Sequence, residues 1–280
     1  MTPRSDAVRI FASAFAPTAS FAALALAALL SILSTGCIDN PLDDQRAPVY
    51  GFDVVAVFPH DPEAFTEGLA YRDGLLYEGT GLYGRSSLRE TILETGEQVR
   101  IRSLPPDIFG EGIVLWGDTL VQLTWREGMG LVWDMENFTV IETFTYPTEG
   151  WGITTDGQSL IMSDGSSVLR FLNPETFDVT RTLDVCSDGE PLSRLNELEW
   201  VEGFIYANVW QTDEIAIISP ETGEVVAWID LSGILTEEER LSSDVLNGIA
   251  YDARSGMLLV TGKLWPETFQ IEIAPLKRPR

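Results

Sequence analysis

The chain has 280 residues, and a hydrophobic fraction of 45% is typical of a folded globular protein rather than a disordered one. Its 43 acidic residues outnumber 18 basic residues, which gives a formal net charge of -25. This balance excludes nucleic acid as a partner, because binding to phosphates needs clustered Lys and Arg. The acidity is typical of a solvated surface that keeps a protein soluble, and selection of cationic substrates is the alternative.

The first 36 residues are similar to an export signal. Arg4 and Arg9 precede an apolar run at residues 21–33, which is followed by small residues at 34–36. This run is too short for a membrane-spanning helix, which needs about 20 apolar residues. We therefore expect residues 1–36 to be removed as a signal peptide.

Cys37 follows these small residues directly, and the segment 33–37 resembles the processing site of bacterial lipoproteins. It predicts a lipid on Cys37 and a periplasmic or outer-membrane protein whose only membrane contact is that anchor. The alternative is a secreted protein in which Cys37 is free or bridged to Cys186; lipidation would instead leave Cys186 as a lone thiol in the core. Residues 37–50 are rich in Asp and Pro and are expected to form a tether.

From residue 51 to 275 the chain consists of short β-rich runs, and one pattern recurs five times. The spacing between successive copies is 44, 40, 46 and 50 residues, which is typical of the four-stranded blades of a β-propeller. The sequence therefore predicts an all-β, five-bladed β-propeller at residues 51–275, with an open β-sandwich as the alternative. The five copies are Phe65–Leu69, Phe109–Ile113, Gly150–Ile153, Leu195–Glu199 and Leu246–Ala250.

A glycine-containing turn follows each copy of the pattern and predicts a tight hairpin between the first two strands of a blade. Residues 236–240 are expected to form a short helical insertion, which explains the last and longest step. The hairpin turns are Asp73-Gly74, Gly117-Asp118, Asp156-Gly157, Glu202-Gly203 and Ser255-Gly256.

The sequence also excludes two kinds of active site. His60 is the only histidine, and its polar surroundings predict a turn that faces solvent. A Ser-His-Asp hydrolase needs a positioned imidazole, and a histidine-based zinc site needs several. Because no cysteine pair has metal-ligand spacing either, a catalytic transition metal is not expected.

Carboxylates remain as groups for proton transfer. Glu111 lies between two glycines, and aromatic surroundings would raise the pKa of its carboxyl towards neutrality. Glu67 occupies the matching position of the preceding copy, so the two acids are expected to lie near one channel and to share a proton. A structural carboxylate that accepts backbone amides is the alternative for Glu111.

Three indoles, Trp125, Trp151 and Trp210, come from different repeats and could form an aromatic-walled pocket for an apolar or cationic ligand. Lys263 is expected either to orient a ligand or to pair with Glu197 or Glu199. The alternative is that the indoles fill the interfaces between blades. We expect that role for Trp116, Trp133, Trp200 and Trp228.

The combined motifs resemble the plant and bacterial glutaminyl-peptide cyclotransferases, in the order found in that family and over nearly everything after residue 50. They are FTEGL at 65–69, YEGTGLYGRSSLR at 77–89, FGEG at 109–112, GWG at 150–152, SDG at 163–165, LNELE at 195–199, ANVWQTD at 207–213, LNGIA at 246–250 and VTGKLWP at 260–266.

The resemblance implies conversion of N-terminal glutamine to pyroglutamate with release of ammonia, without catalytic zinc. Glu111 matches the catalytic glutamate, and Glu67 stands where plant members carry glutamine, as a second proton carrier or a ligand for the substrate amine. Aromatic pocket residues match Phe65, Phe109, Trp125, Trp151 and Trp210, and polar pocket residues match Asn196 and Lys263.

It further implies peptides or proteins with N-terminal Gln as partners, a monomer, and no cofactor for catalysis, although members can hold Ca²⁺ in the channel through backbone oxygens. Two other functions stay open. One is a non-catalytic propeller that binds peptides or proteins, and the other is a different propeller enzyme such as a calcium-dependent lactonase.

Overall fold

The structure is a computed structural model that describes residues 46–276. The expected signal segment, Cys37 and most of the tether lie outside these residues. The first sheet is antiparallel in the order β2-β3-β4-β5. Asp73 and Gly74 both have positive φ, 53° and 88°, as the predicted tight turn between the first two strands requires. The strands are β2 (Thr66–Arg72), β3 (Leu75–Thr80), β4 (Ser87–Ile92) and β5 (Gln98–Ser103).

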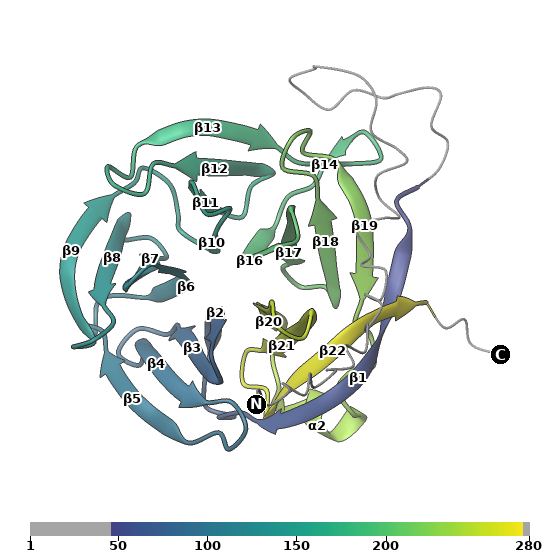
Figure 1. Ribbon diagram of the computed structural model, residues 1–280, viewed down its shortest axis with the longest axis horizontal. Coiled ribbons are helices and arrows are strands. Elements are labelled where there is room, and N and C mark those ends of the chain that lie inside the picture. The colour runs from purple at the N-terminus through teal and green to yellow at the C-terminus, as the bar shows by residue number, and fades with distance from the viewer. Residues whose placement is uncertain (1–45, 277–280) are drawn as a thin grey trace, which may run out of the picture. The chain divides into compact units, whose positions relative to one another are not determined.

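Two further sheets repeat this arrangement, and a short β-ribbon follows them along the chain. Figure 1 shows the sheets arranged around a common centre, with the first strand of each innermost. The strands are β6 (Gly110–Trp116), β7 (Thr119–Thr124), β8 (Met129–Asp134), β9 (Thr139–Thr145), β10 (Ile153–Thr155), β11 (Leu160–Met162), β12 (Val168–Leu172), β13 (Val179–Asp184), β14 (Cys186–Ser187) and β15 (Glu190–Pro191).

The remaining strands form one eight-stranded sheet in the order β16-β17-β18-β19-β1-β22-β21-β20. The first strand, β1, pairs antiparallel with the last, β22, over nine residue pairs, and parallel with β19 through Val49 and Tyr50 alone. The first and last strands of the domain therefore belong to the same sheet. The strands are β16 (Leu195–Val201), β17 (Phe204–Val209), β18 (Glu214–Ile218), β19 (Val225–Asp230), β1 (Val49–Pro59), β22 (Glu267–Pro275), β21 (Met257–Gly262) and β20 (Leu246–Asp252).

The prediction of an all-β fold is confirmed, and the arrangement is propeller-like. The start of the domain differs slightly from the prediction, because Val49 and Tyr50 belong to β1 rather than to a tether. α2 (Glu237–Ser242) confirms the helical insertion, with Thr236 and Glu239 forming a reciprocal capping box. No helix within residues 46–276 has the length and apolar character of a membrane span.

Close approach of neighbouring inner strands explains the recurring glycine. A Cβ on Gly68 would lie 2.4 Å from the backbone nitrogen of Ile113, and one on Gly112 would lie 2.5 Å from the carbonyl oxygen of Trp151. No side chain fits in such a gap, so glycine is required where the strands converge on the centre.

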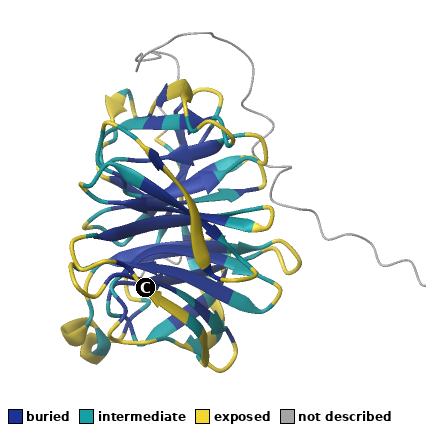
Figure 2. Ribbon diagram, turned by 90° about the vertical axis from the view of Figure 1, so that its left-hand side faces the viewer, coloured by how far each residue is buried: buried dark blue, intermediate teal, exposed yellow. Residues whose placement is uncertain are grey.

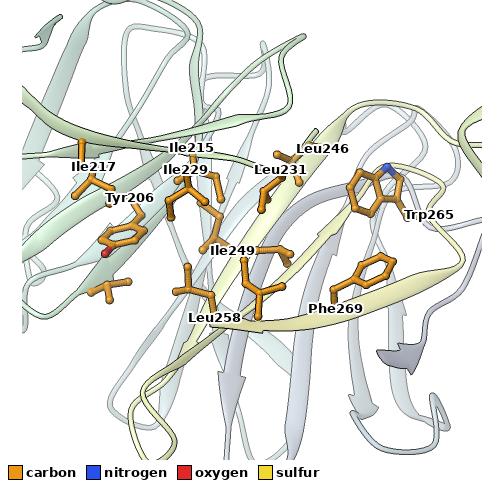
Figure 3. Close-up of a cluster of buried hydrophobic side chains, with 14 of the residues drawn as sticks. Tyr206, Ile215, Ile217, Ile229, Leu231, Leu246, Ile249, Leu258, Trp265 and Phe269 are labelled. Atoms are coloured by element: carbon orange, nitrogen blue, oxygen red, sulfur yellow. The ribbon is translucent and has the colours of Figure 1, made fainter. Parts of the chain in front are cut away.

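Hydrophobic side chains pack between adjacent sheets and between the two halves of the eight-stranded sheet. The outer strands are largely exposed (Figure 2). In one of these cores, Ile215 and Ile229 pack with Ile249, Phe269 and Trp265 (Figure 3). This packing anchors Trp265, which lies two residues beyond Lys263. The indoles expected between sheets are found there: Trp133 is buried, and Trp116, Trp200 and Trp228 pack against core clusters.

Cys186 is buried in the short β-ribbon and is disulfide-bonded, so the expectation of a lone thiol in the core is wrong for this residue. A disulfide is typical of proteins that fold in an oxidising compartment.

Candidate functional site

Irregular pairing at the start of the inner strands positions the site residues. The register shifts between Thr66 and Gly68 in β2 and between Gly110 and Ile113 in β6. Each bulge contains one of the two predicted acids, Glu67 and Glu111, and comparable shifts occur in β16 and β20. β-Bulges redirect side chains out of the regular alternation and are common beside active sites.

Glu67 is 2% exposed and bonded through both carboxylate oxygens. Lys263 Nζ lies 2.6 Å from Glu67 Oε1, and Asn247 Nδ2 donates to Glu67 Oε2 at 3.2 Å. Burial raises the pKa of Glu67, and the lysine charge opposes this shift. Lys263 was expected to pair with Glu197 or Glu199 if it did not orient a ligand; its carboxylate partner is Glu67 instead.

Glu111 is 5% exposed, and its carboxyl forms a hydrogen bond with that of Glu67. Burial raises the pKa of Glu111 well above its ordinary value, and the adjacent charge of Glu67 raises it further. Lys263 favours the charged form of Glu67, whereas burial and the charge of Glu67 both disfavour the charged form of Glu111. The two predicted acids are thus neighbours, and a proton shared between them stays a prediction.

Of the five predicted aromatic residues, Phe65, Phe109 and Trp151 precede the first strand of a sheet, and Trp125 and Trp210 follow the second strand. Phe109 contacts Phe65 at 6.4 Å and Trp125 at 5.3 Å between ring centroids, and Trp151 contacts Trp210 at 5.7 Å. Lys263 Nζ lies 4.6 Å from the centroid of Phe65, which joins the rings to the charged group. All except Phe109 are partly exposed.

Asn196 lies on β16 and is 3% exposed. Its backbone oxygen accepts a hydrogen bond from Ser163 Oγ at 2.7 Å, and Ser163 O accepts the amide of Trp151 at 3.1 Å. Its side-chain Oδ1 is buried and makes no hydrogen bond with any residue in the range 46–276. A buried acceptor in this state can bind a donor on a ligand.

Glu197 and Glu199 do not belong to this group of side chains. The carboxylate of Glu197 accepts the amides of Ile249 and Leu69, at 2.8 and 3.3 Å, and so links three inner strands. Glu199 accepts the amide of Tyr251 at 2.8 Å, and burial raises its pKa to about 8. Both acids are structural carboxylates that accept backbone amides, which is the role that the sequence analysis gave as the alternative for Glu111.

Two further site residues were not found by the sequence analysis. Asn247 contacts Glu67, and Glu149 accepts hydrogen bonds from the indoles of Trp125 and Trp151. Asn247 lies in a recurring motif at the position that corresponds to Glu67 and Glu111, so the repeat contained a usable signal. Glu149 lies in a loop, at the position that Phe65 and Phe109 occupy in the first two copies, so the repeat did not predict an acid there.

His60 is buried, and the prediction that it faces solvent is wrong. Its Nδ1 donates to the carbonyl oxygen of Trp265 at 2.6 Å, and its Nε2 lies 3.0 Å from Glu78 Oε1. Burial alone would lower the pKa of His60, but the charge and hydrogen bond of Glu78 outweigh this effect and raise it. Burial would raise the pKa of Glu78, but His60, Arg89 and Thr66 together lower it. The two residues therefore form a buried ion pair between β3 and the segment that follows β1, and His60 also bonds to the turn that carries Lys263.

We expect His60→Gln to lower the free energy of unfolding by about 1.5–3 kcal/mol near pH 6, because it removes a hydrogen bond between charged groups and leaves Arg89, at 4.0 Å, as the remaining cation beside Glu78. A histidine with a raised pKa stabilises the fold fully below its unfolded pKa, about 6.5, and this contribution disappears as the pH rises through the folded value. Glu78 has a lowered pKa, so its contribution is lost only as the pH falls through its folded value. Urea unfolding of both proteins at pH 6 and pH 9 should therefore show a smaller difference at pH 9; an equal difference would contradict the ion pair.

The fold and site together define a propeller-like protein with two buried, hydrogen-bonded carboxyls beside a lysine and an arc of aromatic rings. The family model described as glutamine cyclotransferase matches residues 23–273. The chain therefore belongs to the glutamine cyclotransferase family, and the resemblance inferred from its motifs is confirmed.

Two individual proteins are similar over most of the chain. A glutaminyl-peptide cyclotransferase of Arabidopsis thaliana is 44% identical over 227 residues, which cover 79% of this chain and 71% of that protein. The crystal structure of Myxococcus xanthus glutaminyl cyclase has a TM-score of 0.74 and 34% identity, and the match covers 83% of this chain and all of that one.

Within residues 46–276, no three His, Cys, Asp or Glu side chains are grouped so that they could hold a metal ion. The calcium ion allowed by the resemblance would use mainly backbone oxygens, and carboxylate ligands are its usual supplement. Glu197, which links the inner strands, already uses both carboxylate oxygens for backbone amides. Glu197 is thus not available as a calcium ligand, and we derive no catalytic step through calcium.

Proposed function

We propose that this chain is a glutaminyl-peptide cyclotransferase that converts the N-terminal glutamine of peptides or proteins to pyroglutamate and releases ammonia. The observation that carries the proposal is the buried Glu111–Glu67 carboxyl pair beside partly exposed aromatic rings, in a member of this family. We also propose that the domain is a monomeric five-bladed propeller. The eight-stranded sheet divides into two blades between β19 and β1, where only two residue pairs connect it.

The reaction is an intramolecular attack of the α-amine nitrogen on the side-chain amide carbon of the same glutamine. A C–N bond forms and closes the ring, and the bond to the amide nitrogen breaks. The attacking nitrogen loses one proton and the departing nitrogen gains one. A carboxyl pair that begins with one proton can therefore donate it to ammonia, take up the proton of the amine, and end with one proton again.

Glu111 is the residue that we propose donates and recovers this proton. The α-amine has an ordinary pKa of about 7.7–8.0, so a carboxyl with a raised pKa can exchange a proton with it near neutral pH. In this mechanism Glu67, held by Lys263, keeps the negative charge that favours protonation of Glu111. No cofactor is needed for these proton transfers.

The aromatic residues would bind the aliphatic part of the glutamine and hold the amine close to the amide carbon. Orientation of this kind contributes several kcal/mol to an intramolecular reaction. Asn196 offers an unused buried oxygen for a substrate N–H, and Lys263 lies beside Phe65 and Glu67, where it can orient a carbonyl group.

An ammonia-release assay on a Gln-initiated dipeptide tests the proposal. We expect release from the free dipeptide and none from the same dipeptide with an acetylated α-amine, because acetylation removes the nucleophile. Rates should be unchanged by a chelator, whereas a calcium-dependent lactonase would lose its activity. Absence of ammonia from the free dipeptide would refute the proposed reaction.

We propose that the protein is exported, which the signal-like N-terminus and the disulfide at Cys186 both support. The sequence holds two cysteines, so an intramolecular bridge would use Cys37. Lipidation would consume the same thiol, so the two fates exclude each other, and Cys37 itself lies outside the described residues. Mass spectrometry of the mature protein before and after reduction distinguishes them, since a bridge adds two hydrogens on reduction and a lipid adds an acyl-bearing mass.

A further inference from the structure

The ring contacts around the site, within residues 46–276, fall into two groups that different sheets contribute. Phe109 contacts Phe65, Tyr83 and Trp125, while Trp151 contacts Trp210. Trp125 follows β7, and Trp151 precedes β10 on the next sheet. The width of a pocket lined by both groups depends on whatever holds these two indoles in relation to each other.

One carboxylate makes that connection. Glu149 Oε2 accepts hydrogen bonds from Trp125 Nε1 at 2.8 Å and from Trp151 Nε1 at 3.0 Å. Glu149 Oε1 accepts from Arg126 Nε at 3.1 Å, and the guanidinium of Arg126 lies 3.7 Å from the centroid of Trp125. The two indoles thus point their N–H edges at a single oxygen atom.

The backbone of this loop is itself fixed. The amide of Gly150 donates to the carbonyl oxygen of Trp125 at 2.9 Å. A Cβ on Gly150 would lie 2.4 Å from Tyr146 Oη and 2.7 Å from the carbonyl oxygen of Thr124, so glycine permits the close approach of the loop to β7. The backbone beside Glu149 is therefore held in place, which limits the positions that its carboxylate can reach.

We propose that Glu149 is a positioning residue that holds the indoles of Trp125 and Trp151 at a fixed separation, so that the pocket for the terminal glutamine is formed before substrate binds. The inference rests on the proposed function for the nature of the ligand. A preformed pocket saves the free energy of ordering two large side chains during binding. Hydrogen bonds to a charged acceptor are the stronger class, which suits a carboxylate to this role.

Ionisation of Glu149 agrees with this role. Burial would raise the pKa of Glu149, but the hydrogen bonds from Trp151, Trp125 and Arg126 outweigh it and lower the pKa. At neutral pH the carboxylate can therefore only accept hydrogen bonds, and it accepts them from the two indoles and the guanidinium.

The test compares Glu149→Ala with Glu149→Gln in steady-state cyclisation of a Gln-initiated dipeptide. Glu149→Ala removes the acceptor, and we expect KM to rise about tenfold with a smaller change in kcat. Glu149→Gln retains one carbonyl oxygen for the indoles, so KM should stay within about threefold of the wild type. Glu142→Ala, the same truncation on the exposed outer strand β9, is the matched control and should leave both constants unchanged.

An equal rise in KM for the Ala and Gln variants would show that the charge of Glu149 matters and not its hydrogen bonds to the indoles, and would overturn the proposal. A wild-type KM in Glu149→Ala would overturn it as well. A second readout needs no turnover. In ¹⁵N spectra, the indole N–H signals of Trp125 and Trp151, assigned through their Phe variants, should exchange faster with solvent in Glu149→Ala than in the wild type. Unchanged exchange would refute the positioning role even if the proposed reaction is correct, and faster exchange without any cyclisation would refute only the reaction.

Discussion

Replacement of Glu111 by Gln is expected to lower kcat for cyclisation by about 10²–10⁴-fold, the usual contribution of a general acid-base group. Glutamine has nearly the shape of the protonated carboxyl and can keep a hydrogen bond to Glu67, so the fold and the pocket should persist. It cannot release a proton to ammonia or take one from the amine. Ammonia release under saturating dipeptide measures the effect directly.

Glu199→Gln is the matched control for this experiment. Burial raises the pKa of Glu199 to about 8, so the glutamine again resembles a largely protonated carboxyl in an inner strand. Its carboxyl contacts Tyr251 and Thr154 rather than Glu67. We expect its turnover to match the wild type. Equal rates for Glu111→Gln and the wild type would remove Glu111 from the mechanism. A non-catalytic binding protein would instead show no turnover in either form and unchanged peptide affinity.

The second large effect concerns the Lys263–Glu67 ion pair. Lys263→Met should destabilise the fold by about 3–5 kcal/mol, because loss of one partner leaves the other charge buried without compensation. Glu67 can escape this penalty by taking up a proton. The carboxyl pair then holds two protons at neutral pH and has no site for the proton of the amine, so kcat should also fall.

The double variant Glu67→Gln/Lys263→Met separates these effects. It removes both charges, and we expect it to recover most of the free energy of unfolding that the single variant loses. Glu111 then titrates without a charged neighbour, so part of the turnover should return with the basic limb of the pH profile shifted to lower pH. Urea unfolding and pH–rate profiles of the three proteins measure both parts. A double variant no more stable than Lys263→Met would contradict the ion pair.

Local features of the sequence predicted most of the secondary structure. The recurring pattern at residues 65–69 and its copies marks the inner strands, and Asp73-Gly74 forms the expected hairpin turn because both residues tolerate positive φ. The short helix at Glu237–Ser242 was also predictable, since its capping box is encoded within four residues. Such signals depend on neighbours in the chain and need no tertiary information.

The partners of charged side chains were not predictable in the same way. Lys263 is 196 residues from Glu67 in sequence, and His60 reaches the carbonyl oxygen of Trp265 across a separation of 205 residues. A polar turn around His60 indicated solvent exposure because composition cannot show that another sheet covers it. Glu149 was missed for the same reason, since only its hydrogen bonds with two indoles distinguish it, and these form only in the folded protein.

The amino-acid sequence by itself therefore determined the all-β class, the repeat and the residue types at the site. Glycines where the inner strands approach each other, and acids in the β-bulges, recur once per sheet and so appear as a pattern in the sequence. The tertiary structure alone decided which acid pairs with Lys263 and which carboxylate accepts hydrogen bonds from both indoles. These contacts join residues on different sheets, so they depend on burial and on distances that neighbours in the chain do not encode.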